Sequence, residues 1–131
     1  MKTVAAAFVA LLVLGSCARD ETAAAYGGAD KVWRVVEIDN VPFAARATLT
    51  FPEPGQIAGD AHCNSYRADM TAPYPWFDAG PIASTRKQCP DYASETRFLN
   101  ALADMNLSEI LGDTMILSTP EGRSIILKAD G

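Results

Sequence analysis

The chain has 131 residues, 49% of them hydrophobic, with 11 basic side chains against 16 acidic ones. This length fits one small domain and excludes two full domains. The net charge of -5 excludes a general nucleic-acid binder, which needs a basic face, and the single histidine, His62, excludes sites built from several histidines. If the protein is exported, its three cysteines leave one thiol without a partner.

The first 16 residues are predicted to be a secretory signal peptide. Lys2 gives the segment a positive start, and Val4 to Leu14 is an unbroken run of 11 apolar residues. As a helix this run would be about 16 Å long, roughly half the thickness of the hydrocarbon core of a bilayer. The run is therefore too short to span a membrane, and residues 1–16 are left out of the fold prediction.

The signal peptide ends at a sequence that resembles a bacterial lipobox, Leu14-Gly15-Ser16-Cys17. The resemblance implies that the Cys17 thiol receives a diacylglyceryl group and becomes the mature N-terminus; the alternative is an ordinary signal peptide followed by a chance cysteine. Several acyl chains would hold the protein at a membrane far more firmly than one. Because residue 18 is alanine and not aspartate, the outer membrane facing the periplasm is the expected location. Residues 17–30, which are mostly small or charged, are expected to form a flexible tether.

Short runs of β-forming residues predict a mature domain built mainly of strands. In the first run, Trp33 and Val35 are expected on one face, and the opposite face is expected to carry Val32, Val36 and Ile38. The expected strands cover residues 32–38, 48–51, 56–61, 66–70, 77–82, 114–119 and 124–129.

Turn signals and one helical pattern complete the predicted fold. Asp39-Asn40 is expected to form a turn, and Pro120-Glu121-Gly122 predicts a hairpin between the last two strands. A helix is predicted from Asp91, as its cap, to near Asn106, with an apolar stripe made of Phe98, Leu99, Leu102 and Met105. Because most strands have no helix between them, the pattern predicts an α+β fold, with an antiparallel sheet or an open β-barrel and one packed helix.

Several segments together resemble the META domain, the family of the HslJ-type heat-shock lipoprotein. The most specific pieces are Cys63-Asn64-x-Tyr66 and Ile82-Ala83-x-Thr85-x4-Cys89, and the likeness covers residues of about 31–129, so the domain is assigned to residues 31–131. The resemblance implies a small antiparallel open β-barrel or strongly curved sheet packed by one α-helix. It also implies no known enzymatic activity and an association with envelope or heat stress. The residues that carry it are Trp33, Gly59, Asn64, Tyr66, Thr85 and Glu95.

One position departs from the family pattern. The family usually has glycine directly before the Cys-Asn pair, where this chain has His62. If that glycine serves a backbone with positive φ, His62 either adopts a disfavoured conformation or the local turn differs.

Cys63 and Cys89 allow three interpretations. Export to an oxidising compartment makes a disulfide the expected state, once Cys17 is assigned to the lipid. A metal site made from His62 and the two cysteines is the second, although structural zinc usually has four ligands at tight spacings. A catalytic Cys63 with His62 as its base is the third, although adjacent residues of an extended segment point in opposite directions.

Two segments are candidate partner surfaces. Arg86 and Lys87 lie in the one compact basic cluster, for which solvated loop charges are the alternative. In Tyr74-Pro75-Trp76-Phe77, Tyr74 and Trp76 could form an exposed apolar patch, whereas the alternative places Phe77 and Trp76 in the core.

The sequence predicts no catalytic residue, metal or cofactor. We expect a monomeric, non-catalytic envelope lipoprotein, anchored to the membrane through Cys17, that binds or supports other envelope components, in particular an envelope protein, under stress. One alternative is a module that binds a small hydrophobic ligand or acyl chain inside the curved sheet. The other is an inhibitor of a periplasmic enzyme of the lysozyme type.

Overall fold

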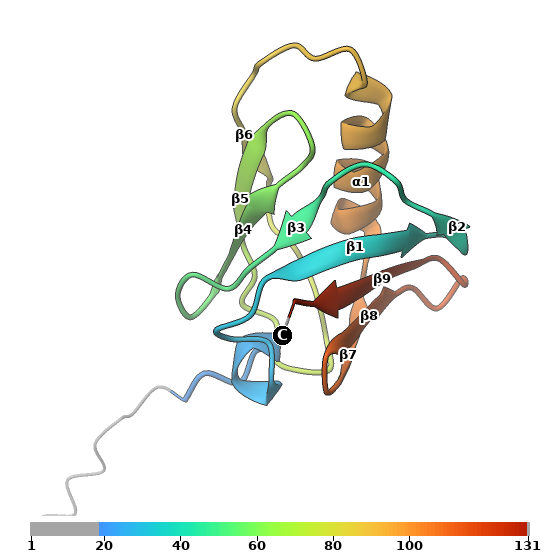
Figure 1. Ribbon diagram of the computed structural model, residues 1–131. Helices are drawn as coiled ribbons and strands as arrows, with labels where there is room; N and C mark the ends of the chain where they lie inside the picture. Colours follow the sequence, from blue (N-terminus) through green and yellow to red (C-terminus); the bar gives the residue numbers. More distant parts are fainter. Residues whose placement is uncertain (1–18, 131) are drawn as a thin grey trace, which may run out of the picture.

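The computed structural model describes residues 19–130, which form two antiparallel sheets and one packed helix (Figure 1). The predicted signal peptide and Cys17, the expected lipidation site, lie outside the described residues. The elements are η1 (Ala23–Tyr26), β1 (Trp33–Ile38), β2 (Val41–Pro42), β3 (Thr48–Leu49), β4 (Gln56–Asp60), β5 (Ser65–Asp69), β6 (Ala83–Ser84), α1 (Tyr92–Asp104), β7 (Leu107–Leu111), β8 (Thr114–Ser118) and β9 (Ser124–Ala129).

The strands divide into a larger and a smaller sheet. The larger has the order β2-β1-β9-β8-β7, with β3 also paired to β1, and the smaller has the order β4-β5-β6. A bridge between Thr50 and Ala58 connects the two sheets where β3 passes β4. The α+β class is confirmed, but the described strands do not close into a barrel, so the barrel expectation is not supported.

Strand β1 carries a bulge that alters the expected alternation of its side chains. Val35 pairs with Leu127 and Glu37 with Ile126, which leaves Val36 as an extra residue in β1. An extra residue reverses the alternation beyond it. Trp33, Val35 and Ile38 are therefore all buried, whereas the sequence predicts Ile38 on the face opposite Trp33.

The helix and the two turns agree with the sequence, whereas two strands do not. The Asp39-Asn40 turn joins β1 to β2, with positive φ at both residues, and β8 and β9 form the expected hairpin. Residues 77–82 form no strand; the short β6 follows instead at Ala83–Ser84. Strand β7 is not among the expected strands. Its polar Ser108 is buried and its apolar Leu111 is exposed, so its sequence lacks the usual alternation of buried apolar and exposed polar residues.

The segment before β1 packs against the domain, which differs from the expected tether. Thr22, Ala23 and Ala24 are buried, and the Trp33 Nε1–H donates a hydrogen bond to the carbonyl of Gly28 at 3.0 Å. Tyr26 stacks on Tyr74 with ring centroids 4.7 Å apart. The small side chains let the backbone approach the sheet closely, so residues 22–28 belong to the folded domain.

One continuous apolar core holds the sheets and the helix together. Helix α1 runs beside the smaller sheet and crosses behind β1 of the larger one (Figure 1). It contributes Phe98 and Leu102 to the core, and the rings of Phe98 and Tyr66 pack edge to face with their centroids 5.6 Å apart. Among residues 19–130, no helix is long and apolar enough to cross a membrane.

Candidate functional site

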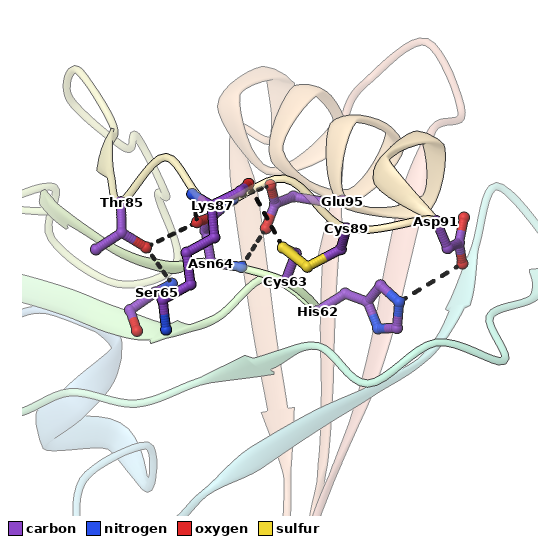
Figure 2. Close-up of a disulfide and its surroundings, with 9 residues drawn as sticks. All are labelled: His62, Cys63, Asn64, Ser65, Thr85, Lys87, Cys89, Asp91 and Glu95. Carbon is purple, nitrogen blue, oxygen red and sulfur yellow. Dashed lines mark hydrogen bonds and ion pairs between the residues drawn. A yellow bond between two sulfur atoms is a disulfide. The ribbon is translucent and has the colours of Figure 1, made fainter.

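The side chain of Asn64 lies at the centre of a polar network (Figure 2). Its Nδ2 donates to the Lys87 carbonyl at 3.1 Å and to Oε2 of Glu95 at 2.7 Å. Its Oδ1 accepts from the Thr85 hydroxyl at 2.9 Å and from the Lys87 backbone N–H at 2.6 Å. All four hydrogen-bonding positions of this amide are therefore occupied, and its orientation is fixed.

Glu95 supports this network from the first turn of α1. Its side chain is only 2% exposed, and its Oε1 accepts from the Asn64 backbone N–H at 2.6 Å. A buried carboxylate is stable only when donors surround it.

Asp91 caps the same helix by accepting hydrogen bonds from Ser94. These hydrogen bonds, with a smaller contribution from His62, hold the pKa of Asp91 below its usual value.

A disulfide between Cys63 and Cys89 lies beside the network and encloses it on one side (Figure 2). It joins the turn between β4 and β5 to the loop before α1 across a sequence separation of 26. The expected disulfide is thus present, and it leaves neither thiol available as a nucleophile or a metal ligand. Within residues 19–130, no group of three or more His, Cys, Asp or Glu side chains is placed to hold a metal ion.

His62 occupies the turn between β4 and β5 with a φ of 101°. Glycine, which the family usually has here, would adopt this left-handed conformation without strain. Histidine adopts it too, but at the cost of some backbone strain. His62 Nε2 lies 3.7 Å from Oδ2 of Asp91, a contact at the surface between the turn and the helix cap (Figure 2).

We expect His62→Gly to raise the free energy of unfolding by about 0.5–1 kcal/mol, because glycine removes the backbone strain while the exposed contact with Asp91 contributes little. The matched variant His62→Ala keeps the strain and loses the contact, so it should be no more stable than the natural protein. Urea unfolding of the oxidised proteins measures both. If His62→Gly were less stable than His62→Ala, the positive φ at this position would not strain the backbone.

The remaining motif residues stabilise the junction between the sheets. The Tyr66 hydroxyl donates to the Thr48 carbonyl at 2.7 Å, and burial raises the pKa of Tyr66. Gly59 lies against the same carbonyl, where there is no room for a larger residue. Together with Trp33, which is fully buried, these residues hold β1, β3, β4 and β5 in place, so their role is structural.

The candidate partner residues lie on two separate surfaces. Arg86 and Lys87 belong to the exposed loop between β6 and α1, and together with Tyr92 they line a groove of about 610 Å³. Tyr74 and Trp76 lie at the opposite end of the molecule, next to η1 and β7 (Figure 1). The basic and aromatic residues thus cannot act as one patch.

The aromatic loop divides between core and surface. Phe77 is 1% exposed and belongs to the core, whereas Trp76 is 57% exposed. Tyr74 is half-buried: it stacks on the exposed Tyr26, and its hydroxyl accepts from the Ile110 N–H at 3.2 Å. Tyr26, Tyr74 and Trp76 are called the aromatic surface below. The sequence could not show the part played by Tyr26, because its partner is 48 positions away.

Solved structures share this fold. An NMR structure of a protein from Burkholderia xenovorans is similar with a TM-score of 0.61 and 20% identity, covering 82% of this chain and 87% of that one. A crystal structure of a DUF4847 family protein from Bacteroides vulgatus is similar with a TM-score of 0.60 and 14% identity, covering 81% and 94%. These identities establish a common fold alone.

No curated protein matches the chain. The family model described as the META domain matches residues 28–130, which include the Asn64 network, the disulfide and the junction of the two sheets. The sequence resemblance is therefore confirmed, and the chain belongs to the META domain family.

Proposed function

We propose that the protein is a non-catalytic lipoprotein of the bacterial envelope, anchored through Cys17, whose domain binds other envelope components close to the membrane. The observation that carries this proposal is the packing of residues 22–28 on the domain. Thr22 follows Cys17 by five positions, a stretch that reaches at most about 18 Å when fully extended. A lipid at Cys17 would thus hold the domain near the bilayer.

The aromatic surface favours one orientation of the anchored domain. Tyr26 follows the anchor by only nine residues and is 55% exposed, and through Tyr74 it is continuous with the loop that bears Trp76. Tyrosine and tryptophan rings are favoured at the boundary between lipid headgroups and acyl chains. We propose that this surface rests on the membrane that holds the lipid, which leaves the opposite end, with Arg86 and Lys87, free for a partner.

The alternative of a ligand inside the sheet has less support. The buried side chains of β1, β8, β9 and α1 form one continuous cluster, and the groove at Tyr92 lies outside that cluster along an exposed loop. A cavity for an acyl chain would need several hundred Å³ of apolar space within the core.

Metabolic labelling with radioactive palmitate tests the anchor. The natural protein should be labelled and should sediment with the outer membrane, while Cys17→Ser should lose both label and sedimentation. An unlabelled natural protein would overturn the anchoring. Crosslinking in intact cells, before and after heat or envelope stress, would then identify the bound component.

Trp76→Ala tests the orientation. Because Trp76 is exposed, we expect the free energy of unfolding to change by less than about 1 kcal/mol. Binding of the non-lipidated Cys17→Ser protein to vesicles of outer-membrane phospholipid, measured by co-sedimentation, should weaken when Trp76→Ala is added. Phe77→Ala, its buried neighbour, is the control and should lose far more stability. Unchanged vesicle binding by Trp76→Ala would show that the membrane does not contact this surface.

A further inference from the structure

The loop from Thr85 to Cys89 combines exposure with an unusual degree of support. It arcs between β6 and α1 away from both sheets (Figure 1), and residues 83–88 are all exposed. The loop is nevertheless held at both ends: the Thr85 N–H donates to the Ser65 carbonyl at 3.0 Å, and Cys89 is joined to Cys63. An exposed loop without such anchors would be mobile.

The Asn64 side chain supports the loop from beneath, on both sides of one residue. It accepts from the hydroxyl of Thr85, and it binds both the N–H and the carbonyl of Lys87. Arg86 lies between these two supported residues, and its own backbone N–H and carbonyl make no hydrogen bond to any described residue. The N–H and the carbonyl of Arg86 itself are thus left to solvent, while the N–H on the far side of the Arg86–Lys87 peptide bond is held by Asn64. None of residues 85–89 has a positive φ.

An exposed loop, held at both ends and with one unpartnered backbone carbonyl, has the features by which rigid loops inhibit serine proteases. Such a loop binds the active site like a substrate, with one side chain in the specificity pocket and that residue's carbonyl free to enter the oxyanion hole. Rigidity before binding removes the cost of ordering the loop and gives tight complexes from interfaces of ordinary size. Lys87 cannot be this residue, because Asn64 binds both its N–H and its carbonyl. Arg86 can, because its carbonyl has no partner among the described residues.

We propose that the Thr85–Cys89 loop is a reactive loop that inhibits serine proteases of trypsin-like specificity, with Arg86 entering their specificity pocket. The carboxylate at the base of such a pocket accepts the planar guanidinium through paired hydrogen bonds. This inference deepens the proposed binding role by naming the class of partner, but inhibition in solution requires no lipid. A failure of anchoring and a failure of inhibition are therefore distinguishable.

The network also explains why the loop would resist turnover. If the protease serine attacks the Arg86 carbonyl carbon, an ester bond forms to Arg86, the bond to the Lys87 nitrogen breaks, and the serine proton passes through the protease histidine to that nitrogen. Asn64 and the disulfide hold the new Lys87 amine beside the ester. The amine can then attack the ester, restore the peptide bond and return the proton, so the intact inhibitor is re-formed before water completes hydrolysis.

The test is inhibition of trypsin by the exported, oxidised protein carrying Cys17→Ser, measured with a chromogenic arginine substrate. We expect competitive inhibition that Arg86→Ala weakens by about 100-fold or more, as for a central interface residue, and that Arg86→Lys largely retains. The matched control is Arg67→Ala, which removes the same charge from the exposed face of β5 and should leave inhibition unchanged. Arg86→Phe should transfer inhibition from trypsin to chymotrypsin.

Four results would overturn the proposal. The first is no inhibition of trypsin by a protein whose disulfide is shown to be intact. The second is rapid, complete hydrolysis after Arg86 without inhibition, which would mean that the loop is a flexible substrate. The third is inhibition of lysozyme, whose cleft is acidic, with trypsin unaffected. Equal loss of inhibition in Arg86→Ala and Arg67→Ala would likewise exclude a specific reactive residue.

Discussion

Replacing Gly59 with alanine is expected to lower the free energy of unfolding by more than about 3 kcal/mol, and to prevent folding if the natural stability is at the low end for small domains. A Cβ at this position would lie 2.1 Å from the Thr48 carbonyl oxygen and 3.1 Å from the Tyr66 hydroxyl. The carbonyl belongs to β3, which is paired to β1, and it also accepts the Tyr66 hydrogen bond. Relief of the clash would therefore move β3 from β4 and break that bond.

The matched control for Gly59→Ala is Gly80→Ala. A Cβ on Gly80 would meet the Asp69 carbonyl at 3.5 Å, an ordinary contact, so the change in stability should stay within about 0.5 kcal/mol. Urea unfolding of both variants, with the disulfide kept oxidised, makes the comparison. Equal stability of the two variants would show that β3 and β4 are not as closely packed as the structure has them.

Replacing Glu95 with alanine is expected to cost about 3–5 kcal/mol. The substitution removes the acceptor for the Asn64 backbone N–H and for one Nδ2 proton, and it leaves both donors in a buried site. Hydrogen bonds to a charged group contribute about 1.5–3 kcal/mol each, and a donor left unsatisfied by the loss of its partner keeps its full desolvation cost. The loss should appear in urea unfolding as a lower midpoint with an unchanged slope.

Two further variants show whether the Glu95 effect comes from the network. Glu95→Gln keeps one acceptor oxygen but turns an amide donor toward Asn64, so its stability should fall between that of the natural protein and that of Glu95→Ala. Asn100→Ala changes an exposed residue of the same helix and should alter stability by no more than about 0.5 kcal/mol. A loss below about 1 kcal/mol for Glu95→Ala would mean that water replaces the carboxylate and that the network does not hold the loop.

Features with a local cause were predictable from single segments. The Asp91 cap and the stripe that includes Phe98 and Leu102 predict α1, and the hairpin of β8 and β9 follows from its turn residues. The tether was predicted from composition alone. Composition reports how flexible a free segment would be, but it does not report that Ala23 and Ala24 fit against the sheet.

The candidate site was only partly predictable. Asn64, Thr85 and Glu95 are identified only by the family resemblance, and the hydrogen bonds from Asn64 to the other two join positions 21 and 31 residues apart. No periodicity connects such positions. The division between the exposed Trp76 and the buried Phe77 was also open, because both are large aromatic residues beside prolines.

The META family, the α+β class, the helix and the expectation of a single disulfide follow from the amino-acid sequence, since these depend on short motifs, local periodicity and cysteine number. Because Cys63 and Cys89 pair, the third cysteine, Cys17, is left for the proposed lipid. The bulge in β1, the packing of residues 22–28, and the exposure and support of Arg86 emerge only in the folded chain. These depend on contacts between distant segments, whose energies no single segment of the chain contains.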